Sequence, residues 1–221
     1  MNISEAIRQR KSIRAYQNKE VSRESVNAIL ETARYSPSGA NAQPWQVAVV
    51  MGETRDRIID ALLSAFRAGE PEDRDYDYYP VKWQQPFKAR RIACGMQLYE
   101  TLGIERQDRQ GRVRQWEANY RGFDAPAMLF FFLDPSLAIG SYMDCGMFIQ
   151  SVMLAALDEG LATCPQAALS GYATLVKEIL GYPRDTILLC GMALGYEEKD
   201  ALVNSYRTPR EEVDSFTWYF D

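Results

Sequence analysis

The spacing of apolar residues along the chain predicts a helix over residues 22–35. Val26, Ile29 and Ala33 recur at intervals of three and four, which places them on one face of a helix. Ser22 is a residue type that is favoured at the start of a helix, and a proline shortly after the segment prevents its continuation. We therefore expect an amphipathic helix whose apolar face packs against a core.

The same pattern predicts the other main elements of the chain. Three apolar runs have the length of buried strands and cover residues 47–51, 126–134 and 186–196. Further helical segments are predicted over residues 53–68, 87–102, 103–120 and 142–159. The last of these is apolar nearly all round, so we expect it to be buried on every side. With no internal repeat and no linker, residues 1–221 are interpreted as one α+β domain.

The charge pattern narrows the class of function. The net charge is −5 and the pI is ≈ 5.0, which argues against non-specific binding to nucleic acid. The longest membrane-like stretch covers residues 145–157, whereas a spanning helix needs about 20 residues. The N-terminal stretch MNISEAIRQRKSIRAY is charged from position 5 and has no apolar core. We therefore expect a cytoplasmic protein without a membrane partner.

The chain has no histidine, and its four cysteines are Cys94, Cys145, Cys164 and Cys190. The absence of histidine removes Ser–His and Cys–His nucleophile pairs as well as histidine metal ligands. The cysteines form no CxxC pair and lie among apolar residues, so we expect reduced core thiols and no metal site. If the chain is an enzyme, a bound organic cofactor is expected to supply the chemistry.

Two clusters of cationic side chains could bind a phosphate group. They comprise Arg10, Lys11, Ser12 and Arg14 in RQRKSIRAY, and Arg207 and Arg210 in NSYRTPREE. Arginine presents a planar fork of donors that suits phosphate oxygens. The alternative for both clusters is a solvated, charged surface.

Two further stretches offer amide and backbone groups. SPSGANAQPW presents Asn41 and Gln43 directly before a predicted strand. Such amides are costly to bury without partners, so a ligand would explain them, and an ordinary helix-to-strand turn is the alternative. In GLATCPQAAL, the small side chains of residues 165–168 let backbone N–H groups approach a flat ligand closely.

In their order and spacing, RKSIRAY, SPSGANAQPW, GLATCPQAA and RTPR resemble the motifs of the FMN-dependent nitroreductase family. The likeness extends over essentially the whole chain. The stretches GSYMDCGMFIQ, LATCPQAA and LCGMALGY resemble the branch that contains bacterial nitrobenzoate and nitroaromatic reductases.

The resemblance implies an α+β sandwich with a central, mostly antiparallel sheet flanked by helices. It also implies an intertwined homodimer with two FMN sites at the subunit interface. The implied activity is ping-pong reduction of a small aromatic acceptor, either a nitroaromatic or a quinone. In this scheme NAD(P)H delivers hydride to flavin N5 and leaves before the acceptor binds. No side chain is implied as catalytic.

The resemblance assigns roles to individual residues. The flavin phosphate would be held by Arg10, the Lys11 backbone, Ser12, Arg207 and Arg210. The flavin ring would be met by Arg14 near N1 and O2, and by the Ala167 N–H at N5 with Pro165, Gln166 and Ala168 beside it. The other subunit would contribute Pro37, Ser38 and Asn41. Trp45 would anchor that loop in the core.

The chain departs from the family pattern in two respects. The family's lysine two places before the arginine of the C-terminal motif is Ser205 here, so the phosphate clamp must differ. The family's mid-chain flavin contacts cannot be aligned onto residues 85–97, where Lys88, Arg90 and Arg91 are only candidates.

Residues 69–80, GEPEDRDYDYYP, form an acidic, tyrosine-rich loop without apolar periodicity. We expect a mobile lid in which Tyr76, Tyr78 and Tyr79 bind the acceptor, and a solvated surface loop is the alternative.

Two other functions remain open at this stage. Glu72 and Tyr76 have the spacing of the lid residues in iodotyrosine deiodinases, which are reductive dehalogenases, although no lysine occurs between Lys88 and Lys177 to complete the set. A flavin-binding redox sensor or store without turnover is the alternative from another class.

Overall fold

A four-stranded antiparallel sheet lies at the centre of the protein in a computed structural model that describes residues 2–221. The strands are β1 (Trp45–Met51), β2 (Ala127–Leu133), β3 (Ala162–Gln166) and β4 (Ile187–Gly195). Their spatial order is β1-β2-β4-β3, and each neighbouring pair is antiparallel. Within the described residues, β1 and β3 are therefore the edge strands.

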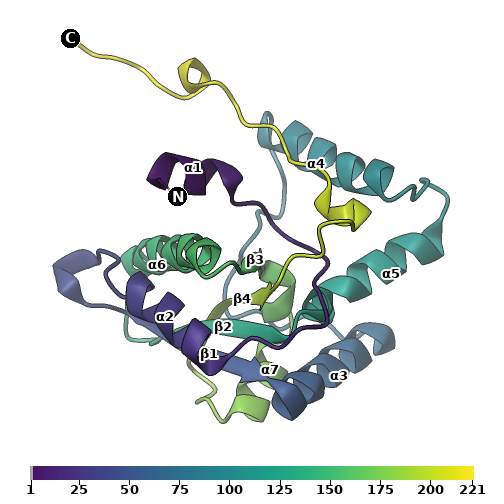
Figure 1. Ribbon diagram of the computed structural model, residues 1–221, viewed down its shortest axis with the longest axis horizontal. Helices are drawn as coiled ribbons and strands as arrows, with labels where there is room; N and C mark the ends of the chain where they lie inside the picture. The colour runs from purple at the N-terminus through teal and green to yellow at the C-terminus, as the bar shows by residue number, and fades with distance from the viewer. Residues whose placement is uncertain (1) are drawn as a thin grey trace.

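The described part of the chain also contains seven α-helices. They are α1 (Ile3–Gln9), α2 (Arg23–Ala33), α3 (Gly52–Ala68), α4 (Phe87–Thr101), α5 (Arg109–Tyr120), α6 (Gly140–Asp158) and α7 (Ala173–Leu180). Helices α2 and α6 cover one face of the sheet, and α3 and α7 cover the other (Figure 1). This arrangement confirms the predicted α+β sandwich with a central antiparallel sheet.

Strand β2 is buried on both faces, which explains its run of seven apolar residues. Because side chains alternate along a strand, Leu129 and Phe131 pack into the core beneath α2 and α6. Phe130 and Phe132 pack into the opposite core beneath α3 and α7. The two cores therefore lie on opposite faces of the sheet, and β2 contributes side chains to both.

Most of the predicted elements are confirmed. Helix α2 begins at the predicted cap, where the Ser22 hydroxyl accepts a hydrogen bond from the Ser25 N–H at 3.0 Å. Its buried residues are the predicted Val26, Ile29 and Ala33. The predicted strands and the helices that became α3, α4 and α6 agree with the structure to within two residues at each end. Of the predicted segment 103–120, α5 covers only Arg109–Tyr120.

The hydrophobic pattern does not predict β3 or α7. Strand β3 contains Pro165, which lacks an N–H and is poorly suited to the interior of a sheet. The structure accommodates this proline because β3 is an edge strand, paired only with β4 among the described residues. Helix α7 has eight residues, which is short for a periodicity to be recognised.

The prediction that residues 142–159 are buried on every side is wrong for the single chain. Helix α6 buries Cys145, Phe148 and Val152 against the sheet, but Met143 is 69% exposed. One side of this apolar helix is thus accessible. None of the helices that the structure describes has both the length and the hydropathy needed to cross a membrane.

The prediction of four core thiols is wrong for one of them. Cys145, Cys164 and Cys190 are free and buried, whereas Cys94 is free and exposed on α4. Helix α4 has no buried residue, so the apolar neighbours of Cys94 in the sequence do not form a core around it. Burial raises the pKa of the Cys145 thiol to about 11 and that of Cys190 to about 12.

The short helix η3 (Ala167–Ser170) lies directly on β4, and this contact depends on a glycine. A Cβ atom added to Gly191 would lie 2.6 Å from Cβ and Cδ1 of Leu169, which is fully buried. We predict that Gly191→Ala lowers the free energy of unfolding by about 1–3 kcal/mol, because the core is overpacked. Urea unfolding measures this change.

Gly95→Ala is the control for that substitution, because no atom lies within 4 Å of a Cβ added at Gly95 in α4. We expect the control to be neutral or stabilised by up to about 1 kcal/mol. Equal urea midpoints for the two variants would contradict the close contact between η3 and β4.

The thiol pKa values predict that one cysteine per chain reacts rapidly with a thiol reagent at pH 8. The thiolate is the reactive form, and the raised pKa values keep Cys145 and Cys190 protonated until the pH approaches about 11 or 12. Burial raises the pKa of the Cys164 thiol as well and shields it from the reagent. Cys94→Ser should remove the fast reaction, and unfolding in urea should expose the remaining thiols. A fast thiol that persists in folded Cys94→Ser would refute the assignment.

Candidate functional site

A pocket of ≈ 960 Å³ opens where the N-terminal segment meets the C-terminal turn. It is lined by Ile7, Arg8, Arg10, Lys11, Ser12, Arg14, Cys94, Tyr206, Arg207, Thr208, Arg210, Glu211 and Phe216. The two predicted cationic clusters, almost 200 residues apart in the sequence, therefore line one pocket. Sequence reasoning did not single out Arg8, which extends the first cluster back into α1.

Asn204 holds the two segments together. Its side chain accepts the Arg14 N–H at 2.8 Å and donates to the carbonyls of Ala15 and Glu198, both at 2.9 Å. Asn204 is 1% exposed, so these hydrogen bonds form away from water. Sequence reasoning missed this residue, and a lone asparagine before the RTPR motif gives little signal.

The Lys11 amine is committed to contacts within the chain. Its Nζ donates to the Asn204 carbonyl oxygen at 2.6 Å and forms an ion pair with Glu197 at 2.8 Å. The Lys11 backbone is thereby fixed at the pocket wall while its charge is neutralised. This geometry is compatible with a role through the backbone, which remains a prediction.

The other five cations in the pocket lack a carboxylate partner. Among residues 2–221, no ion pair is formed by Arg8, Arg10, Arg14, Arg207 or Arg210. Arg207 Nη2 instead donates to the Arg10 carbonyl oxygen at 2.6 Å. Glu211 also lines the pocket, but its carboxylate pairs with Arg90 at 2.9 Å. Burial and the nearby charges of Arg210 and Arg207 lower the pKa of Arg10.

The arrangement fits an anion with several oxygens. Guanidinium groups without carboxylate partners can donate charge-assisted hydrogen bonds to phosphate, and its charge would relieve their mutual repulsion. Ser205 does not replace the missing lysine, because its hydroxyl donates to the Leu202 carbonyl at 2.7 Å and the residue does not line the pocket. None of Lys88, Arg90 and Arg91 lines the pocket, and Arg90 pairs with Glu211, which does.

Arg14 lies between the N-terminal segment and the C-terminal turn. Its Nη1 is 3.4 Å from both the Ser12 carbonyl oxygen and the Tyr206 hydroxyl. Its guanidinium carbon lies 6.0 Å from the centre of the Phe123 ring. Burial raises the pKa of Tyr206, so its hydroxyl stays protonated and neutral beside the cation.

Residues 165–168 lie close to this N-terminal segment. The Ile13 N–H donates to the Thr163 carbonyl at 3.0 Å, so the segment runs alongside β3. Gln166, at the end of β3, is 5% exposed, and its Nε2 donates to the Asn119 carbonyl at 2.9 Å. The Gln166 Oε1 atom is buried and has no hydrogen-bond partner among the described residues.

The predicted residues Pro37, Ser38 and Asn41 do not line the pocket of their own chain. They surround η1 (Gly39–Asn41), where Asn41 adopts a φ of 56° and is exposed. Gln43 is satisfied locally, because its Nε2 donates to the Asn41 carbonyl at 3.2 Å. The contribution of this loop to a second subunit stays a prediction.

Trp45 follows that loop and stacks on Phe148 of α6, with ring centroids 4.6 Å apart and planes 6° apart. It packs at the edge of the core beneath α2 and α6. The predicted anchoring of the loop by Trp45 is confirmed.

The prediction of an unpacked loop is wrong for residues 73–76. Asp75 accepts the Lys177 amine at 2.6 Å and the Leu188 N–H at 2.8 Å. The Tyr76 hydroxyl donates to the Leu189 carbonyl at 2.7 Å, and its ring meets Tyr142 edge-on at 5.3 Å. Tyr76 is thus an anchor of the loop in this chain.

Tyr78 and Tyr79 remain accessible. They are 48% and 54% exposed and form an aromatic cluster with Trp83, with Tyr79 and Trp83 ring centroids 5.7 Å apart. No tyrosine of this loop lines the cationic pocket. Acceptor binding by Tyr78 and Tyr79 stays a prediction. Within residues 2–221, no group of three or more His, Cys, Asp or Glu side chains could hold a metal ion.

Comparison with known proteins identifies the family. The model of the nitroreductase family matches residues 7–196. The chloronitrobenzene nitroreductase of Comamonas testosteroni is 36% identical over 219 residues, which is 98% of this chain and 96% of that protein. The crystal structure of the FMN- and NADPH-dependent nitroreductase NfnB from Sphigopyxis sp. strain HMH superposes with a TM-score of 0.97 at 38% identity and full coverage of both chains.

The crystal structure of the FMN-dependent nitroreductase NfnB from Mycobacterium smegmatis in complex with NADPH gives a TM-score of 0.93 at 32% identity, again with full coverage of both chains. These likenesses extend over the pocket and over both cationic clusters that line it. The chain belongs to the nitroreductase family.

Proposed function

We propose that this protein is a cytoplasmic, FMN-dependent NAD(P)H oxidoreductase that reduces nitroaromatic and quinone acceptors. The observation that carries the proposal is the pocket in which Arg10, Arg207 and Arg210 converge without a carboxylate partner among the described residues. The names of the relatives support it, since they include a chloronitrobenzene nitroreductase and FMN- and NADPH-dependent nitroreductases.

The residues of the pocket would hold FMN by its phosphate. Arg10 and Arg207 would both donate hydrogen bonds to the phosphate, because the Arg207 guanidinium is hydrogen-bonded to the Arg10 carbonyl and is thereby held beside Arg10. Ser12 and the Lys11 backbone would complete the wall, and Arg210 would close the C-terminal side. When bound, FMN supplies the two-electron chemistry that takes reducing equivalents from NAD(P)H and passes them to the acceptor.

The chain would stabilise charge on the flavin ring without an acid–base side chain. Arg14 is a cation held between Ser12 and Tyr206, and it would lie near N1 and O2 of the ring. The backbone at Pro165, Ala167 and Ala168 would contact the ring at N5. These residues lie where β3 leads into η3, and β3 runs alongside the N-terminal segment.

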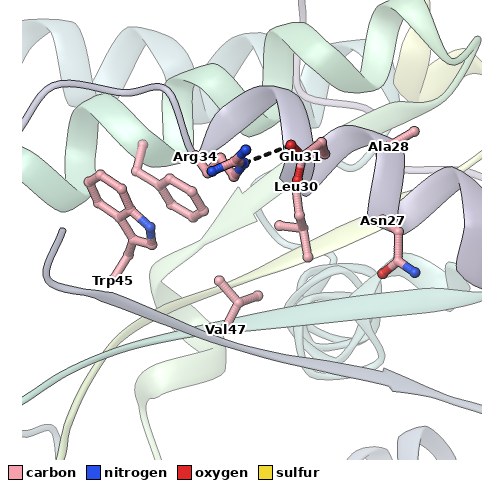
Figure 2. Close-up of a pocket in the computed structure, with 8 residues that line it drawn as sticks. Asn27, Ala28, Leu30, Glu31, Arg34, Trp45 and Val47 are labelled. Carbon is pink, nitrogen blue, oxygen red and sulfur yellow. Dashed lines mark hydrogen bonds and ion pairs between the residues drawn. The ribbon is translucent and has the colours of Figure 1, made fainter.

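The accessible surfaces of the chain support a homodimer. An apolar groove of ≈ 720 Å³ runs between α2 and β1, and Leu30, Trp45 and Val47 face into it (Figure 2). Along this groove β1 has no partner strand on its outer side within the described residues. The C-terminal tail extends away from the body of the molecule (Figure 1), and Phe220 is 93% exposed.

The tail of a second copy suits this groove. Residues 216–220 present aromatic side chains of the kind that fill apolar grooves, and the free strand edge offers backbone hydrogen bonds. A second copy would also cover the accessible side of α6 and bring Pro37, Ser38 and Asn41 towards a flavin of its partner.

The deiodinase alternative lacks free recognition groups. Glu72 is engaged by Arg74, with Nε at 3.0 Å, and the Tyr76 hydroxyl is engaged by the Leu189 carbonyl. Neither residue is free to bind the charged groups of an amino-acid substrate. These contacts favour nitroreduction over reductive dehalogenation.

The function is tested by denaturing the purified protein to identify its cofactor, and by anaerobic turnover with NADH or NADPH and a panel of acceptors. We expect FMN rather than FAD, and consumption of NAD(P)H that depends on a nitroaromatic or a quinone. A chain that takes up no FMN would refute the proposal. A chain that binds FMN but turns over no acceptor would instead be a redox sensor or store, and iodotyrosine turnover alone would support the dehalogenase.

We predict that Arg207→Ala weakens FMN binding more than it alters the reactivity of the flavin that remains bound. Loss of a hydrogen bond to a charged group costs about 1.5–3 kcal/mol. That loss corresponds to a roughly tenfold to hundredfold weaker affinity, measured by fluorescence titration of FMN. The control is Arg184→Ala, whose side chain is 82% exposed and pairs with Glu178 at the surface. Equal affinity in both variants would move the phosphate contact away from Arg207.

We predict that removal of residues 216–221 dissociates the dimer, because the aromatic anchors of the tail are lost. Light scattering on a size-exclusion column measures the mass, and 25.2 kDa is the mass of one chain. Removal of Asp221 alone is the control and should leave the dimer intact. A truncated protein that keeps the dimeric mass at low concentration would show that the tail is dispensable.

A further inference from the structure

Arg74 connects the loop after α3 to the short helix η3. Its Nη1 donates to the Ala167 carbonyl oxygen at 2.5 Å and to the Ser170 hydroxyl at 3.3 Å. The Ser170 hydroxyl donates to the same carbonyl at 2.9 Å. The Ala167 carbonyl therefore accepts two side-chain hydrogen bonds, and one of them comes from a cation.

Glu72 fixes the direction of this guanidinium. Its two carboxylate oxygens accept Arg74 Nε and Nη2, each at 3.0 Å, in a bidentate pair. The Tyr120 hydroxyl, 3.4 Å away, approaches the same carboxylate from α5. The Arg74 side chain is 21% exposed. The guanidinium is thus held by Glu72 in an orientation that leaves Nη1 directed at η3.

The backbone around Arg74 is docked as well. The Asp73 N–H donates to the Gly171 carbonyl at 2.8 Å, and the Asp73 carboxylate accepts the Thr174 N–H at 3.2 Å. A Cβ added to Gly171 would lie 3.0 Å from Glu72 Oε1 and from the Ala168 carbonyl oxygen. The loop therefore packs closely on the turn from η3 to α7, and this holds the backbone next to Arg74 beside the turn.

The contact acts on a peptide group that adjoins the proposed flavin site. The carbonyl of Ala167 and the N–H of Ala168 belong to the same planar amide, whose electrons are delocalised. A cation that hydrogen-bonds the carbonyl draws electron density towards the oxygen, and this makes the N–H a stronger donor. The Arg74 guanidinium also places a positive charge behind η3, the turn that would contact the flavin ring.

We infer that Arg74 is a positioning residue that fixes and polarises the Ala167–Ala168 peptide, and thereby favours the reduced form of FMN bound at this turn. The inference rests on the proposed function for the presence of FMN, and on the contacts above for the state of the peptide. The Ala168 N–H lies next to the Ala167 N–H that is assigned to N5, and a stronger donor there and a nearby cation both stabilise the flavin ring when it gains electrons.

The substitution Arg74→Gln removes the positive charge and the bidentate pair with Glu72. The matched control is Arg67→Gln. Arg67 forms a similar bidentate pair with Glu117, with Nε–Oε1 at 2.7 Å and Nη2–Oε2 at 3.2 Å. This control pair joins α3 to α5 and is not hydrogen-bonded to η3. A difference between the two variants then reports the contact with the Ala167 carbonyl and not the loss of an ion pair.

The first measurement is the midpoint potential of the bound FMN, obtained by equilibration with a reference dye. Arg74→Gln should weaken the binding of reduced FMN relative to oxidised FMN by about tenfold. For a two-electron couple that change lowers the potential by about 30 mV. Arg74→Lys keeps the charge and should recover part of the shift, and Arg67→Gln should have the wild-type potential. An unchanged potential in Arg74→Gln, or equal loss of affinity for both forms, would overturn the inference.

The second measurement needs no FMN. Amide hydrogen exchange of the flavin-free protein should be faster across residues 167–171 in Arg74→Gln than in Arg67→Gln, because η3 loses its anchor. Equal protection in the two variants would overturn the inference that Arg74 fixes the peptide. A chain that binds no FMN in the first measurement would refute the proposed function, and the exchange rates would still decide the role of Arg74 in the turn.

Discussion

The cationic pocket depends on one buried side chain, Asn204. Two of its side-chain hydrogen bonds, to Arg14 and Ala15, join the segment after the last strand to the segment after the first helix, and a third, to Glu198, holds the C-terminal segment itself. Because it is 1% exposed, removal of its side chain would leave the Arg14 N–H without its partner and without access to water. The Lys11 amine adds a further contact to the Asn204 carbonyl. Segments far apart in the sequence thus form one wall.

The pocket brings together positive charges that no carboxylate of the described residues neutralises. The chain has a net charge of −5, yet Glu197 and Glu211 pair with Lys11 and Arg90 and leave the arginines of the pocket free. Like charges held close together raise the free energy of the folded state. A bound anion removes that penalty, so occupancy of the pocket and stability of the fold are coupled. The local arrangement, not the overall charge, determines which ligand the chain can hold.

Much of this organisation follows from the sequence, but the contacts that orient the turn do not. The apolar periodicity of α2 and the unbroken apolar run of β2 predict both elements, because each reflects burial against a core. Strand β3 escapes this reasoning, since Pro165 is tolerated only through the edge position that the full sheet gives it. The motifs predict which arginines could meet a phosphate. They do not predict Asn204 or Arg74, whose roles arise from partners more than 90 residues away in the sequence.

The helix η3 is held from three directions that the tertiary structure brings together. Leu169 lies against Gly191 of β4, Arg74 holds the Ala167 carbonyl, and β3 leads into η3 from beside the N-terminal segment. In contrast, Tyr78 and Tyr79 lie beyond the last anchor of the same loop and remain accessible. The loop therefore has a fixed half that would tune the cofactor and an accessible half that could vary without disturbing it. Such a division allows acceptor specificity to change while the flavin site keeps its geometry.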